Sequence, residues 1–308
     1  MTLPPPTVAY DLSLLQKGPA RGSAQDHGWC YGLPPGLSPE QWPLSPHDGY
    51  PMQHGFTLLV PEQYRAQGPD YVALSIFADQ QYDEPVEVAA VADYFASETP
   101  QQTSDRSLLP FWIHRTHRHP MEFRMKDIID RNFAAIWLTE AEFAAPLCEP
   151  PELGDNLLLQ TNPLPLWLEK GAARAVFECQ VGDAEHTADL EKKYWYRMFG
   201  HIPETGHRAY GIAVNVRQGD PNVGRPPRDP ILHKDEIGDY LAPVGEAGQR
   251  LRPLAGRNHL GGTMFPSQWT PKFSPTYLEI EEHFGGFNFG GGNAQLDLVT
   301  MKFEWASG

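Results

Sequence analysis

Three histidines lie close together in this sequence, at His114, His117 and His119. Imidazole nitrogens are common zinc ligands, and a His-x-x-His-x-His spacing could bring two or three of them to one ion, with Glu122 as a neighbouring carboxylate. Two arginines interleave with the histidines, and their charges would repel a dication. The pattern therefore favours a solvated basic loop, and we expect no bound metal and no cofactor. A metal-dependent hydrolase is the alternative, and a contact for an anion or a partner is a third interpretation, because this is the only dense basic island in an acidic chain.

A second group of candidate residues is acidic. Glu279, Glu281 and Glu282 form a run near the C-terminus, and Asp239 precedes them in a polar stretch. On a strand, Glu279 and Glu281 would share one face because successive side chains alternate, and such a carboxylate pair could serve acid–base chemistry. A solvated strand face or a docking surface for a basic partner explains the run more simply. We expect these four acids to contact a partner.

Aromatic residues supply the remaining candidates. Thr187 begins a pattern typical of one helix over 187–199, and this helix carries Tyr194-Trp195-Tyr196. Three consecutive positions point in different directions on a helix, so at least one ring should be exposed. Exposed aromatic rings beside acids are typical of protein–protein hot spots, and we expect Trp195 and Tyr196 to contact the partner.

Motifs for nucleophilic or phosphate chemistry are missing from the sequence. It contains no Gly-x-Ser-x-Gly and neither of the glycine-rich phosphate loops. The glycines at 290–292 precede an apolar stretch typical of a strand, so they predict a turn. We therefore expect a protein that is not an enzyme.

Composition narrows the class of partner. The 308 residues include 39 acidic and 24 basic side chains, for a formal charge of −15. Such a surface repels nucleic acid and anionic membrane and attracts a basic protein. Three widely spaced cysteines indicate reduced thiols, the N-terminus lacks the features of a signal peptide, and no apolar run is long enough to span a bilayer. We expect a soluble cytoplasmic protein.

The elements that must position these residues are mostly strands. With 31 prolines and 28 glycines the chain predicts many turns and short elements. We predict an α+β fold, predominantly antiparallel β, with two β-rich halves and a few short helices. An irregular lead-in over 1–28 precedes the halves at 29–160 and 161–308. Strands are expected at 55–60, 71–77, 133–138, 173–179 and 210–216, a capped helix starts at Thr139, and 217–257 is expected to be a long surface excursion.

The two halves echo one another weakly. Gly36, Trp42-Pro43 and an apolar strand at 56–60 are matched in the second half by Gly261-Gly262, Phe265-Pro266 and 277–280. Duplication and shared turn chemistry both explain this pattern.

Two islands of the chain resemble a known family. The first runs from Gly36 through Gln41-Trp42-Pro43 and Gly49-Tyr50-Pro51-Met52 to 71–77, and the second covers 260–268, 277–281 and 286–298. Both resemble the YwqG-like domain of unknown function. The resemblance implies a mostly β, two-part fold without an established enzymatic activity. It also implies a setting beside secreted bacterial toxins, including type VI secretion, in which such a protein would be an immunity protein.

We therefore expect a non-enzymatic cytoplasmic binding protein, a bacterial immunity protein that occludes a cognate and basic secreted toxin. A β-sandwich binder of small ligands or glycans, using exposed tryptophan and tyrosine, is a further alternative. The sequence leaves the oligomeric state open.

Overall fold

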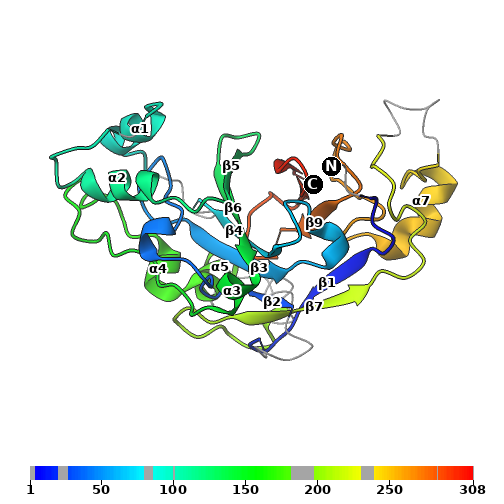
Figure 1. The fold of residues 1–308 in the computed structure, drawn as a ribbon. Helices are drawn as coiled ribbons and strands as arrows, with labels where there is room; N and C mark the ends of the chain where they lie inside the picture. The colour runs from blue at the N-terminus through cyan, green and yellow to red at the C-terminus, as the bar shows by residue number, and fades with distance from the viewer. Residues whose placement is uncertain are drawn as a thin grey trace.

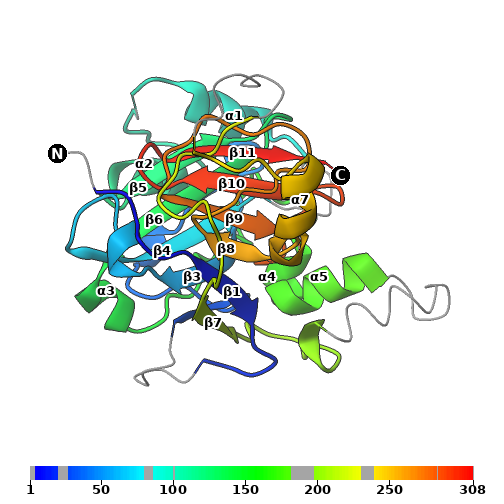
Figure 2. The same cartoon turned by 90° about the vertical axis from the view of Figure 1, so that its right-hand side faces the viewer.

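The computed structural model describes residues 4–19, 27–79, 86–99, 101–181, 198–229, 239–282 and 284–307. One antiparallel sheet of eleven strands runs through the molecule, in the order β11-β10-β9-β8-β1-β7-β2-β3-β4-β6-β5 (Figures 1 and 2). The prediction of a predominantly antiparallel β fold with a few short helices is confirmed.

The strands are short, as the frequent glycines and prolines predict. Their bounds are Tyr10–Leu14 (β1), Gly28–Cys30 (β2), Gln53–Leu59 (β3), Tyr71–Ala78 (β4), Glu122–Lys126 (β5), Asn132–Thr139 (β6), Tyr210–Val216 (β7), Asn258–Leu260 (β8), Tyr277–Glu281 (β9), Asn293–Asp297 (β10) and Lys302–Ala306 (β11).

The helices are also short and lie around the sheet. They are α1 (Ala89–Ala96), α2 (Leu109–Thr116), α3 (Glu140–Ala144), α4 (Leu166–Lys170), α5 (Ala172–Val181) and α7 (Gly245–Leu251), with 3-10 turns at Pro39–Gln41, Glu62–Tyr64 and Arg252–Leu254. None of the helices in the described ranges is long and apolar enough to cross a membrane.

The strand order is the same when it is followed outward from the centre in either direction. From the central pair, β7-β2-β3-β4-β6 runs to one side and β1-β8-β9-β10-β11 to the other, with β5 added at one edge. The path through the first-half strands β2, β3, β4 and β6 begins with β7 from the second half, and the path through the second-half strands β8 to β11 begins with β1 from the first half. After the first strand, each path follows chain order. The sheet therefore has the order expected of two equivalent halves that have exchanged their first strands, and the matched sequence elements lie at equivalent places in the two paths.

The main core lies on the curled sheet. The long strands β4 and β6 are mostly apolar on both faces and almost wholly buried, as expected for strands with both faces covered. The two edges approach each other, since β5 contacts β11 and the rings of Phe133 and Phe303 are 4.3 Å apart. A smaller cluster of Leu44, Tyr50, Val91, Phe111, Leu153 and Leu159 lies beneath α1, α2 and the proline-rich segment 146–165.

Several expected elements are confirmed. Strands cover the apolar stretches at 55–60, 71–77, 133–138 and 210–216. The Thr139 side chain accepts from the backbone N–H of Glu142, and Glu142 caps the backbone of Thr139 in return, which is the predicted capping box.

Other expectations are wrong. The segment expected as an irregular lead-in contains β1, which lies at the centre of the sheet. Residues 173–179 form part of α5 and not a strand, because Arg174 and Glu178 pair four positions apart at 2.6 Å while the alanines face the core. The excursion at 217–257 contains α7 and buried polar residues. The helix expected over 187–199 lies largely outside the described residues.

Candidate functional site

A row of polar side chains crosses five neighbouring strands. Asp11 of β1 is paired in register with Asn215 of β7 on one side and with His259 of β8 on the other. His259 is paired with Glu279 of β9, and Glu279 with Gln295 of β10. Directly paired residues share one face of a sheet, so all five side chains lie on the same side.

His259 and Glu279 form the innermost pair of this row. The His259 Nδ1 donates to the carbonyl oxygen of Gly261 at 2.8 Å, and its Nε2 lies 3.0 Å from Glu279 Oε1. The Glu279 carboxylate also accepts from the backbone N–H of Phe265 at 3.0 Å and from Gln295 Nε2 at 3.3 Å. Both side chains are 0% exposed. The pair could exchange a proton, but it is closed to solvent and fully used in holding the β8–β9 connection.

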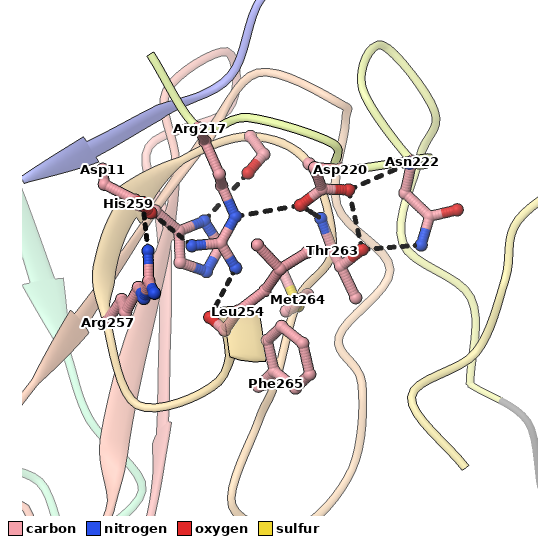
Figure 3. A network of polar contacts seen from close by, with 12 residues as sticks. Asp11, Arg217, Asp220, Asn222, Leu254, Arg257, His259, Thr263, Met264 and Phe265 are labelled. Carbon is pink, nitrogen blue, oxygen red and sulfur yellow. Dashed lines mark hydrogen bonds and ion pairs between the residues drawn. The ribbon is translucent and has the colours of Figure 1, made fainter. Parts of the chain in front are cut away.

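Arg217 joins this row to the loop after β7 (Figure 3). Its Nε donates to Asp220 at 2.9 Å, one terminal nitrogen donates to Asp11, and the other donates to the carbonyl oxygen of Leu254 at 2.7 Å. The guanidinium group also lies over the ring of Phe265, 5.9 Å from its centre. Burial opposes the charge on Arg217, but the hydrogen bonds to Asp220 and Asp11 outweigh it and raise the pKa of the guanidinium.

Asp220 is the centre of the second half of the network. Its Oδ2 accepts from Arg217 and from the backbone N–H of Thr263 at 2.8 Å, and its Oδ1 accepts from the backbone N–H of Asn222 at 2.9 Å and from the Thr263 hydroxyl at 2.8 Å. Burial alone would raise the pKa of Asp220, but the bonds from Thr263, Asn222 and Arg217 lower it. Asn222 extends the network to both backbone groups of Leu241 through its amide.

We call this network the bracket. It ties the loop after β7, the turn at Leu254 and the β8–β9 connection to the sheet. Its Asp11 end is partly open to solvent, and there Arg257 adds an ion pair at 2.7 Å. A pocket of about 470 Å³ lies there, lined by polar residues of β1, β7 and the approach to β8: Asp11, Ser13, Asn215, Arg257 and Asn258, together with Leu12 and Gly256. The pocket can bind polar groups, whereas the ion pair between Arg217 and Asp220 is buried and closed to solvent.

The three clustered histidines do not converge. His114 is buried at the end of α2, where its Nδ1 donates to the carbonyl oxygen of Glu40 at 3.3 Å. His119 is buried too, accepts from the backbone N–H of Met121 through Nδ1, and lies 3.1 Å from Glu142 through Nε2. His117 is exposed.

The partners of these histidines account for the absence of a shared centre. Glu122, the fourth residue of the metal alternative, is taken up by two arginines. Among the described residues no group of three or more His, Cys, Asp or Glu side chains is placed to hold a metal ion. The metal-hydrolase alternative therefore has no support in the geometry.

The acids expected to contact a partner occupy different environments. Glu279 is inside the molecule, so the expectation that it lies on a solvated strand face is wrong. Glu281 and Glu282 are half-buried, and burial raises the pKa of each carboxyl. Asp239 is exposed. Trp195 and Tyr196 lie outside the described residues.

An apolar groove that the sequence did not single out lies over the smaller core cluster. Its volume is about 420 Å³. The lining is mostly proline, leucine and tyrosine with two acids: Tyr50, Pro51, Pro150, Pro151, Glu152, Leu153, Gly154, Asp155, Leu164 and Leu168. The prolines limit backbone motion, and the Tyr50 hydroxyl is held by the carbonyl oxygens of Leu159 and Asn162 at 3.3 and 3.2 Å. The groove is therefore preformed.

Comparisons with known proteins give no relative: no family model matches the chain, and neither do curated proteins or solved structures.

Proposed function

We propose that this protein is a non-enzymatic binding protein and that the groove at Tyr50, Pro151 and Leu164 holds an apolar, positively charged segment of a partner protein. The observation that carries the proposal is the combination of a preformed apolar floor with an acidic rim. Ligand grooves are concave, largely apolar and supplied with a few polar groups that set orientation, and this groove has that composition.

Exposed apolar side chains gather in the segment that forms the groove. Leu147, Leu157 and Leu164 are 44%, 72% and 48% exposed, and Leu164 lines the groove itself. Single exposed leucines need no explanation, but several beside a proline-walled groove are typical of a surface that a partner covers.

Charge selects the kind of partner. Segment 147–168 contains Glu149, Glu152 and Asp155 and no lysine or arginine. Glu152 and Asp155 line the groove and are exposed. The whole chain carries −15 as well, so both the local and the long-range field attract a basic partner.

The immunity role is a special case of this proposal. It would apply where the basic partner is a secreted bacterial toxin, as the resemblance to the YwqG-like domain implies, and occlusion of the toxin would be the mechanism. Glu281, Glu282 and Asp239 would then steer the encounter without contacting the groove.

The test is to pan a displayed library of random peptides against the whole protein and to measure selected peptides by fluorescence anisotropy. We expect sequences that combine leucine or proline with lysine or arginine. Leu164→Ser removes an apolar contact from the groove and should weaken binding about tenfold, since burying a leucine is worth about 1.5–3 kcal/mol. Glu152→Lys with Asp155→Lys should slow association most at low salt.

Two matched variants control for general effects. Leu157→Ser changes an exposed leucine of the same segment outside the lining, and Glu246→Lys reverses an exposed charge on α7. Both should bind as the unmodified protein does. Selected peptides without basic residues, or equal binding by Leu164→Ser and Leu157→Ser, would refute the proposal.

A further inference from the structure

A second, smaller pocket has the opposite charge. It has a volume of about 200 Å³ and lies between α2 and the β5–β6 hairpin. Three arginines and a histidine dominate its lining, which comprises Pro46, Phe95, His114, Arg115, Arg118, Arg124 and Asn132. We propose that this pocket binds a small dianionic oxyanion of the phosphate class, either free or as a phosphomonoester.

Two of the arginines are fixed by the protein itself. Arg115 donates to the carbonyl oxygens of Tyr94 and Ser97 at 2.8 and 2.7 Å, so its guanidinium is held at the pocket wall. Arg124 donates to the carbonyl oxygen of Leu44 at 2.9 Å and is ion-paired with Glu122. Guanidinium groups whose orientation is set in advance lose little entropy when they bind an oxyanion.

Arg118 is only partly engaged. Its Nε is paired with Glu122 at 3.3 Å, and its side chain is 41% exposed. Within the described part of the chain its two terminal nitrogens make no hydrogen bond or ion pair. They present the forked donors that match two oxygens of a phosphate group.

His114 contributes to the pocket as a neutral ring. Its Nδ1 donates to the Glu40 carbonyl oxygen, so its Nε2 is the acceptor for Arg124 Nη2 at 3.0 Å. Burial, and then the charge of Arg124, lower the pKa of His114 to about 3, which keeps the ring uncharged at neutral pH. The ring therefore orients Arg124 without competing for the anion.

The charges in the pocket do not balance. Among the residues that the structure describes, Glu122 is the one carboxylate paired with these arginines, which leaves two of the three guanidinium charges without a carboxylate. Asp79 lies one layer further away, where its carboxylate accepts from the backbone and side-chain amide of Asn132 at 3.0 and 2.7 Å, and Asp48 interacts with Asp79. A phosphate group carries between one and two negative charges at neutral pH and would pair with the two guanidinium charges that Glu122 does not neutralise.

Pocket size limits the ligand. A water molecule occupies roughly 30 Å³, so about 200 Å³ holds a phosphate group with a small substituent and is below the range of roughly 300–1,000 Å³ for drug-sized ligands. Phe95 and Pro46 supply the apolar part of the wall, where such a substituent would lie.

Isothermal titration calorimetry of the whole protein with inorganic phosphate tests the proposal, with sodium chloride adjusted to constant ionic strength. We expect saturable binding of one phosphate per chain and displacement by phosphoserine. Arg118→Gln should weaken phosphate binding about tenfold or more, since it removes charge-assisted hydrogen bonds. Malonate binding with no response to phosphate would overturn the phosphate assignment.

Arg208→Gln is the matched control. Arg208 is also exposed and paired with a glutamate four positions away, Glu204, at 2.7 Å, but it lies outside this pocket. It should bind phosphate as the unmodified protein does. Phosphate that binds no better than chloride, or binding lost equally in Arg118→Gln and Arg208→Gln, would overturn the proposal.

Discussion

Replacing Asp220 by asparagine changes one atom of the charged bracket and keeps its shape. Each carboxylate oxygen of Asp220 accepts two hydrogen bonds: Oδ2 from Arg217 and the Thr263 backbone, and Oδ1 from the Asn222 backbone and the Thr263 hydroxyl. An asparagine amide group therefore faces two donors whichever way it is turned. The better orientation puts the amide at Oδ1, because the Thr263 hydroxyl oxygen, which already accepts from Asn222 Nδ2 at 2.9 Å, can accept a second bond. The Asn222 N–H and the Thr263 hydroxyl proton then lose Asp220 as their acceptor.

The cost of this change follows from the lost hydrogen bonds and from the lost counter-charge of Arg217. A buried N–H without a partner costs about 1–3 kcal/mol. Arg217, whose side chain is 0% exposed, keeps Asp11 but loses its second counter-charge. Removing one partner of a buried ion pair costs about 3–5 kcal/mol, and the remaining carboxylate reduces that figure. We expect Asp220→Asn to lower the free energy of unfolding by about 3 kcal/mol at pH 7.

Urea unfolding followed by tryptophan fluorescence measures this difference, with Asp239→Asn as an exposed control that should stay within about 0.5 kcal/mol. The pH dependence gives a second check. The folded pKa of Asp220 is lowered, so its contribution is complete above the unfolded pKa of about 3.9 and is lost as the pH falls through the folded value. The gap between the two proteins should be constant from pH 7 to pH 5 and narrow below about pH 4. A gap at pH 7 under about 1 kcal/mol would refute the bracket.

Two further predictions concern the backbone and the thiols. Gly28→Ala should lower the free energy of unfolding by at least about 2 kcal/mol, because residue 28 has a φ of 112° and a Cβ there would collide with the carbonyl group of Thr57 on the neighbouring strand. Gly154→Ala is the control, since no atom lies near the added carbon, and it should leave the free energy of unfolding unchanged in the same urea titration. Burial raises the pKa of the Cys148 thiol to about 11 and raises the pKa of the Cys30 thiol further still, whereas Cys179 is exposed. A thiol reagent should therefore modify one cysteine per native chain quickly and all three only in denaturant, and fast modification of Cys30 in the native protein would contradict this.

Local patterns predicted the strands well where apolar residues dominated. The run from Tyr71 to Phe77 is apolar enough to require burial on both faces, and β4 is such a strand. The prediction of a strand at 173–179 is wrong, because a short segment with alternating apolar residues fits both the strand period and the helix period. The ion pair between Arg174 and Glu178 favours the helix, but it forms only when the helix does.

The candidate sites were harder to predict because they depend on register. The sequence predicts Glu279 on a solvated strand face, yet the pairing of β9 with β8 places it against His259 and makes it internal. Arg217 and Asp220 looked like part of a polar loop, although two opposite charges three positions apart directly after a strand are a signal that could have been weighed. The acidic groove depends on Pro51, Pro150 and Pro151, and prolines in a sequence predict turns without showing that distant ones line one groove.

The exchange of first strands has a consequence for how the chain is made. Ser13 of β1 pairs with Ala213 of β7, two hundred positions later, and β8 follows later still. At a synthesis rate of roughly 5–20 residues per second, β1 leaves the ribosome roughly 10–40 s before its first partner exists. During that time β1 and the inner edge of β2 are both unpaired strands, which are the surfaces through which nascent chains associate wrongly. The first half cannot complete its part of the sheet before β7 and β8 have been synthesised. The sheet therefore forms late, in one cooperative folding step that involves both halves.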